Sequence, residues 1–121
     1  MDNILLLENY NEKIFDFKKL MSQKESILIK NSNNVKIILN SKINKIIIEN
    51  SLNISVMLIS TISGIDIEKS KNIKIYSEIP KNINYLDCYK SEVIIYLSQI
   101  KDNNNFKINS KLSKIEYLIK N

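Results

Sequence analysis

The stretch ENSLNISVML, residues 49–58, decides the fold because the stretches before and after it repeat its pattern. KNSNNVKIIL covers residues 30–39, and EKSKNIKIYS covers residues 68–77. Aligned, they place a serine, an asparagine and a branched aliphatic residue at intervals of 19 residues: Ser32, Ser51 and Ser70; Asn34, Asn53 and Asn72; Val35, Ile54 and Ile73. Isoleucines at positions 27 and 29 recur at 46 and 48 and again at 65 and 67. The chain therefore contains an internal repeat.

Each repeat predicts two short strands joined by a bend. Apolar residues alternate with other residues, which is the period of a strand with one buried face. A repeat this short cannot bury its own apolar face, so successive copies must stack. The pattern predicts an all-β solenoid in which Ile29, Ile48 and Ile67 form one core ladder. Because the chain has one glycine, we expect the asparagine column to adopt left-handed backbone at the bend and to hydrogen-bond from coil to coil.

The repeat drifts toward both ends of the chain. YLDCYKSEVII (85–95) matches IDIEKSKNIKI (65–75) after the insertion of one residue, and the bend at Pro80 tolerates an irregular step. FKINSKLSKIEYLI (106–119) gives a last, looser pair of strands. We expect one domain over residues 1–121, with capping strands in 1–26, regular coils in 27–97 and the last coil in 98–121. The solenoid would have roughly five or six coils of about 19–20 residues each.

Composition argues against an enzyme. The chain has no histidine, and all 18 basic residues are lysines, so the common general base and the bidentate arginine clamp are both missing. A single glycine leaves no Gly-rich phosphate loop. Cys88 has no histidine to activate it, and we interpret it as a small buried hydrophobic residue. We expect no catalytic residues, no metal and no cofactor.

The same composition bears on location and partners. No apolar run reaches about 18 residues, and the first residues lack the pattern of a signal peptide. We therefore expect a cytoplasmic protein that does not bind membranes. The net charge of +5 comes from scattered lysines without interleaved aromatic residues, so we expect no nucleic-acid binding. The charge would instead speed the encounter with an acidic protein.

One outward column of the predicted solenoid is apolar or amphipathic in four coils. We call its members, Ile38, Met57, Tyr76 and Tyr96, the ridge. Such a stripe is unusual in water, so either a terminal segment or a second copy of the chain covers it, or it binds a protein partner. Lys36 and Lys74 precede ridge residues by two positions, and Lys42 and Lys45 follow the first regular coil.

Several motifs resemble one known family. Lys42-Ile43-Asn44 opens a strand that ends in Glu49-Asn50-Ser51, a valine-rich motif corresponds to GIDIEKSKNIKI at 64–75, and an L-Y-L-S motif corresponds to IYLS at 95–98. In this order and spacing they resemble the C-terminal β-sheet (CARP-type) domain of cyclase-associated proteins, which bind actin monomers. The resemblance covers roughly residues 5–119.

The resemblance implies a right-handed parallel β-helix that binds ADP-bound actin monomers and promotes their exchange of ADP for ATP. It also implies a cytoskeletal location and allows a homodimer, because the family's domain usually dimerises through a C-terminal hairpin. Together with the ridge and its lysines it gives the expected partner-binding residues: Ile38, Lys42, Asn44, Lys45, Met57, Lys74, Tyr76 and Tyr96.

Two other functions stay open for such a solenoid. A tubulin-cofactor-C-like protein would share the fold, but that family uses a catalytic arginine and this chain has none. A self-assembling β-helix scaffold without catalytic activity would stack its coils end to end. Such scaffolds tend to be glycine-rich at their bends, whereas this chain has a single glycine.

Overall fold

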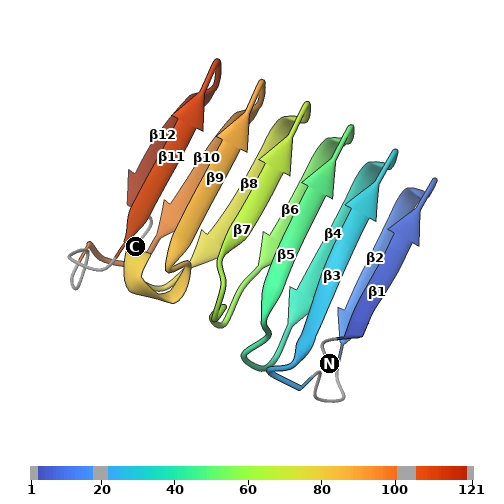
Figure 1. Cartoon of the computed structure of the whole chain (residues 1–121), viewed down its shortest axis with the longest axis horizontal. Helices are drawn as coiled ribbons and strands as arrows, with labels where there is room; N and C mark the ends of the chain where they lie inside the picture. Colours follow the sequence, from blue (N-terminus) through green and yellow to red (C-terminus); the bar gives the residue numbers. More distant parts are fainter. Residues whose placement is uncertain (1–2, 18–21, 101–105, 120–121) are drawn as a thin grey trace.

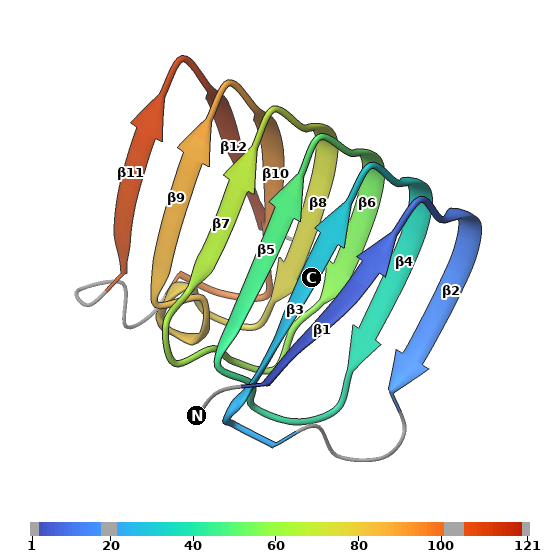
Figure 2. The ribbon, with the colours of Figure 1, turned by 45° about the vertical axis from the view of Figure 1, so that its right-hand side comes forward.

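The computed structural model describes residues 3–17, 22–100 and 106–119. Within them the chain forms two six-stranded parallel sheets that face each other in a right-handed parallel β-helix (Figures 1 and 2). Sheet A holds β1 (Asn3–Glu8), β3 (Glu25–Lys30), β5 (Lys45–Glu49), β7 (Ile65–Glu68), β9 (Tyr85–Tyr89) and β11 (Lys107–Lys111). Sheet B holds β2 (Asn11–Phe17), β4 (Asn33–Leu39), β6 (Leu52–Met57), β8 (Lys71–Ser77), β10 (Glu92–Leu97) and β12 (Lys114–Ile119). The predicted fold class is confirmed.

The core consists of the ladders that the repeat predicted. Ile29 pairs with Ile48, and Ile48 pairs with Ile67, in successive strands of sheet A. These side chains are no more than 1% exposed, because alternate residues of each strand point between the two sheets. Sheet B contributes the facing ladder, which includes Ile37, Val56, Ile75 and Ile95.

At the tight corner between each strand of sheet A and the next strand of sheet B, residues other than glycine adopt the left-handed backbone conformation. Asn31, Asn50, Asn53 and Asn72 have φ between 47° and 56°. Asparagine tolerates this conformation better than most residues. The Nδ2 of Asn72 donates to the Oδ1 of Asn53 at 2.6 Å, as predicted, whereas the Nδ2 of Asn53 donates to Asn33 at 2.9 Å rather than to Asn34.

A ladder of buried serines runs along the same corner. The hydroxyl of Ser51 accepts from the backbone N–H of Ser32 at 3.1 Å and donates to the carbonyl of Glu49 at 2.9 Å. The same pair of bonds recurs at the buried Ser32, Ser70 and Ser91, and at Ser113, which is half-buried at the end of the ladder. The serine column is visible in the sequence, but the repeat predicted hydrogen bonds between coils for the asparagines alone.

The opposite corner carries the longer connections, at the lower end in Figure 1. One of them contains the 3₁₀ turn η1 (Pro80–Asn82) and shifts the register, so that Ile65 pairs with Leu86. The predicted insertion of one residue, which aligned Ile65 with Tyr85, is therefore wrong in β9. It is correct in β10, where Ile73 pairs with Val93, because the turn after Ser91 is one residue shorter than the turn after Ser70.

No helix in the described part of the chain has the length and apolar character that a membrane crossing needs.

Candidate functional site

The ridge lies on the outer face of sheet B. Ile38 pairs with Met57, Met57 with Tyr76, and Tyr76 with Tyr96, each in the next strand. All four side chains are half-buried. The prediction that they stand in one column is therefore confirmed. Leu118, in β12, pairs with Tyr96 and extends the column by one coil.

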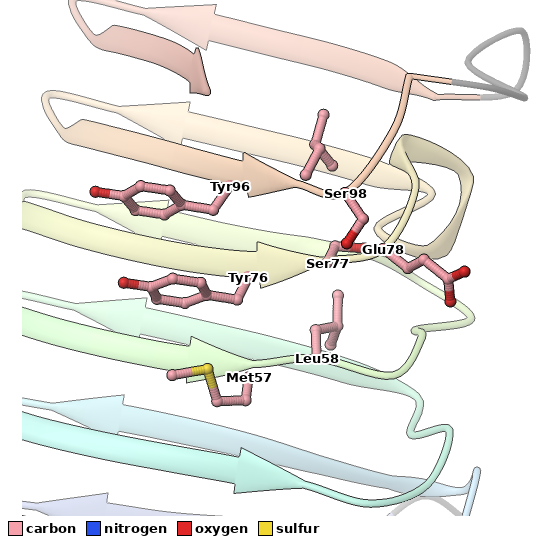
Figure 3. A pocket seen from close by; sticks show the side chains of 8 residues that line it. Met57, Leu58, Tyr76, Ser77, Glu78, Tyr96 and Ser98 are labelled. Atoms are coloured by element: carbon pink, nitrogen blue, oxygen red, sulfur yellow. The ribbon is translucent and has the colours of Figure 1, made fainter. Parts of the chain in front are cut away.

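The two tyrosines of the ridge form its most ordered part. Their rings stack with centroids 4.5 Å apart and planes 7° from parallel, as Figure 3 shows beside the thioether of Met57. Stacking holds the two rings in one orientation, so these side chains have little conformational freedom left to lose. The rings also border an open hollow that reaches Leu58, Glu78 and Ser98, where the strands of sheet B end (Figure 3).

A second outward column of sheet B runs beside the ridge. It contains Lys36, Ser55, Lys74 and Ile94 in successive strands. Across strands β4 to β10 these two columns hold two lysines and no carboxylate, while acidic residues occur in the outermost strands, Asp16 in β2 and Glu116 in β12. The central part of this face is therefore apolar with positive charge along one side.

Three of the predicted site residues lie elsewhere. Lys45 begins β5 in sheet A, and its ammonium group lies 2.8 Å from the carboxylate of Asp66. Asn44 holds the corner in place, because its amide donates to the Oγ of Ser26 at 3.0 Å and accepts from the Oγ of Ser63 at 2.8 Å. Lys42 is exposed in the connection between β4 and β5. The structure thus brings together Ile38, Met57, Lys74, Tyr76 and Tyr96, but not Lys42, Asn44 and Lys45.

Sheet A presents a different outer face. Glu49, Asp66, Glu68 and Asp87 line one shallow groove together with Tyr89. Asp66 pairs with Lys45, and Asp87 accepts from the amide of Asn109 at 3.3 Å. In their central strands the two faces therefore differ in character: sheet A gathers carboxylates there, whereas sheet B is apolar with lysines along one side.

Sequence reasoning missed Ile94 and Leu118 as members of the face. Leu118 follows Tyr96 by 22 residues in the pairing of β10 with β12, so a search at the 19-residue period does not reach it. Ile94 stands opposite Lys74, and its column is lysine or serine in the preceding coils. The alternation within β10 and β12 was the available signal for both.

The one cysteine of the chain is not poised for chemistry. Cys88 is fully buried in the core. Burial, with smaller contributions from the nearby Asp87 and Asp66 carboxylates, raises the pKa of its thiol to about 12. A thiol held neutral in this way is a poor nucleophile. Among the residues that the structure describes, no three potential metal ligands come together.

Comparison with known proteins gives consistent results. The family profile described as "Adenylate cyclase associated (CAP) C terminal" matches residues 2–120. A solved structure, the crystal structure of the cyclase-associated protein from Cryptosporidium parvum, superposes with a TM-score of 0.80 at 25% sequence identity. The match covers 100% of this chain and 73% of that one. Among curated protein sequences, none matches significantly.

Proposed function

The chain belongs to the family of the C-terminal domain of adenylate cyclase associated proteins, and on this premise we propose that it binds actin monomers. The family is known for actin binding and is associated with the cytoskeleton. The resemblance first noticed in its motifs is thereby confirmed. We propose the cytoplasmic cytoskeleton as the place where the protein acts.

The observation that carries this proposal is the ridge on sheet B. Interface anchors are typically aromatic or thioether side chains that lose their remaining water when the partner arrives. Met57, Tyr76 and Tyr96 are half-buried and already packed in one row. Lys36 and Lys74 beside them supply positive charge, which would speed encounter with an acidic partner and weaken as salt rises.

We further propose that the protein prefers ADP-bound actin and speeds the replacement of ADP by ATP. The chain has no arginine and no Gly-rich loop, so in this proposal it does not touch the nucleotide as a P-loop would. Faster exchange would then come from tighter binding to the actin conformation that releases nucleotide, because a ligand shifts an equilibrium only by its differential affinity.

The test is the double variant Met57→Ala with Tyr76→Ala, measured by sedimentation with fluorescently labelled ADP-actin monomers. Removal of two anchors should weaken binding about 5- to 150-fold, roughly 1–3 kcal/mol. The matched control is Leu6→Ala with Leu52→Ala. Both leucines are exposed apolar residues that lie outside the ridge, and their removal should leave the affinity within about twofold.

The remaining candidate is self-association, in which a second copy of the chain covers the ridge as a homodimer or scaffold contact. The same double variant separates the two. If it binds actin normally but sediments with a changed oligomeric state, the ridge is a contact between copies, and the actin site must lie on another face.

A further inference from the structure

The corner that carries the longer connections gathers three lysines into one groove. Lys42 comes from the connection after β4, Lys81 from η1, and Lys107 from the first position of β11. We call these three residues and the hollow between them the lysine groove. It lies away from the ridge, since its other lining residues are Thr61, Ile62, Ser63, Asn84 and Tyr85.

The charge of the lysine groove is uncompensated within the described residues. None of its lining residues is acidic. The ion pairs found in this part of the chain involve other lysines, namely Lys45, Lys71 and Lys114. Three like charges on one concave surface raise the local potential and attract anionic groups.

The floor of the groove is fixed by hydrogen bonds. The hydroxyl of Thr61 donates to the carbonyl of Ile83 at 2.7 Å and accepts from the N–H of Gly64 at 3.0 Å. The amide of Asn84 donates to the carbonyl of Ile62. Two of these bonds tie neighbouring coils together, so the residues between the lysines are held in place and need gain little order on binding.

The spacing of the lysines favours one kind of ligand. Lys42 and Lys107 stand three coils apart along the corner. Backbone hydrogen bonds link the successive coils there: Ile43 to Ser60, Thr61 to Asn82, and Asn84 to Lys107. At about 4.8 Å per coil, the backbones of the two lysines are separated by roughly 14 Å. An extended peptide covers that distance with about four or five residues. To meet on a single phosphate group, the side chains of Lys42 and Lys107 would have to bend toward each other along most of that distance, whereas an extended ligand spans it directly. Nucleic-acid binding would need a row of stacking rings, whereas the groove contains one, Tyr85.

We propose that the lysine groove binds an extended acidic segment of a protein partner, with carboxylates meeting Lys42, Lys81 and Lys107. This function is separate from the proposed actin contact and uses none of the ridge residues. The protein could therefore hold a second acidic chain while sheet B stays available.

The experiment uses the ¹⁵N-labelled full chain and a hexaglutamate peptide, followed by NMR at low salt. Saturable shifts should appear in the amides of Thr61, Ser63 and Asn84. The triple variant Lys42→Gln, Lys81→Gln and Lys107→Gln should weaken binding at least about tenfold. The matched control removes the same charge at exposed lysines elsewhere, Lys13→Gln, Lys90→Gln and Lys111→Gln, and should keep the affinity within about threefold.

Several outcomes would overturn the proposal. One is equal loss of affinity in the control triple variant, which would mean non-directional attraction to net charge. Another is tighter binding at the same amides by inorganic pyrophosphate or oligothymidylate, which would make the groove a phosphate or nucleic-acid site. A third is concentration-dependent shifts there without peptide, which would make it a contact between copies. The ridge variant Met57→Ala with Tyr76→Ala should bind the peptide unchanged, so failure of the actin proposal leaves this result independent.

Discussion

At the scale of single residues, the fold depends on polar atoms as much as on isoleucine. Ser51 is 1% exposed, yet its hydroxyl both accepts and donates a hydrogen bond. A buried hydroxyl is tolerated only when it is paired in this way. The serine ladder therefore pairs backbone N–H groups of the tight corner, whereas the carbonyl of Glu49 also accepts the N–H of Asn31.

Ser51→Ala should lower the free energy of unfolding by about 1–3 kcal/mol, because the buried N–H of Ser32 loses its acceptor. The carbonyl of Glu49 loses the serine hydroxyl but keeps the N–H of Asn31. Urea denaturation followed by circular dichroism measures the change. Ser55→Ala is the control, since Ser55 lies on the outer face of sheet B and its loss should cost less than about 0.5 kcal/mol. Equal effects of the two substitutions would show that the ladder carries no special stability.

Cys88 gives a prediction on pH. Its pKa is about 12 in the folded protein against an ordinary value of 9.0, so between these values the unfolded chain has lost a proton that the folded chain keeps. Stability from this group is therefore complete below pH 9 and falls as pH rises toward 12. Denaturation of the wild type and of Cys88→Ala at pH 8 and pH 10.5 measures it. The variant should lose less stability than the wild type over this interval. An identical loss in both proteins would contradict the raised pKa of the Cys88 thiol. The pKa of Tyr117 is raised by burial and, to a smaller extent, by Cys88, so only the part due to burial is common to both proteins.

At the scale of strands and turns, the sequence predicted what depends on alternation and missed what depends on turn geometry. The columns of Ile29, Ile48 and Ile67 follow from a two-residue period repeated every 19 residues, because a register shift would expose every core side chain. The register of β9 did not follow. It depends on the number of residues in the connection between β8 and β9, which contains η1, and alternation does not record the length of a connection.

The same distinction explains the site. The ridge was predictable because its four residues share one strand phase. The lysine groove was not, since Lys42 and Lys81 lie in two different connections and Lys107 begins β11, with no common period. Only the path of the chain at the irregular corner brings them together. Lys45 was expected near the ridge, but after the corner the chain belongs to the other sheet.

At the scale of the whole molecule, the two ends of the solenoid are unequal. At the first coil, Tyr10 packs edge-on against Phe15, with ring centroids 4.9 Å apart, and Leu7 is 4% exposed. At the last described coil, Tyr117 and Ile119 continue the core ladders of Ile95 and Leu97 but are 44% and 51% exposed. Each coil of a solenoid is stabilised mainly by its neighbours, so the end that contains β11 and β12 should open more readily than the end that contains β1 and β2.

Hydrogen exchange should therefore be slowest for the amides of β5 to β8, faster for β1 and β2, and fastest for β11 and β12. The central coils have neighbours on both sides, and local opening costs least where apolar contacts are fewest. Mass spectrometry of exchanged peptides at low micromolar protein concentration measures this order. Protection of β11 and β12 equal to that of the centre at every concentration would contradict it. Protection that grows with concentration would show that a second copy of the chain covers this end, because only a bimolecular contact depends on protein concentration.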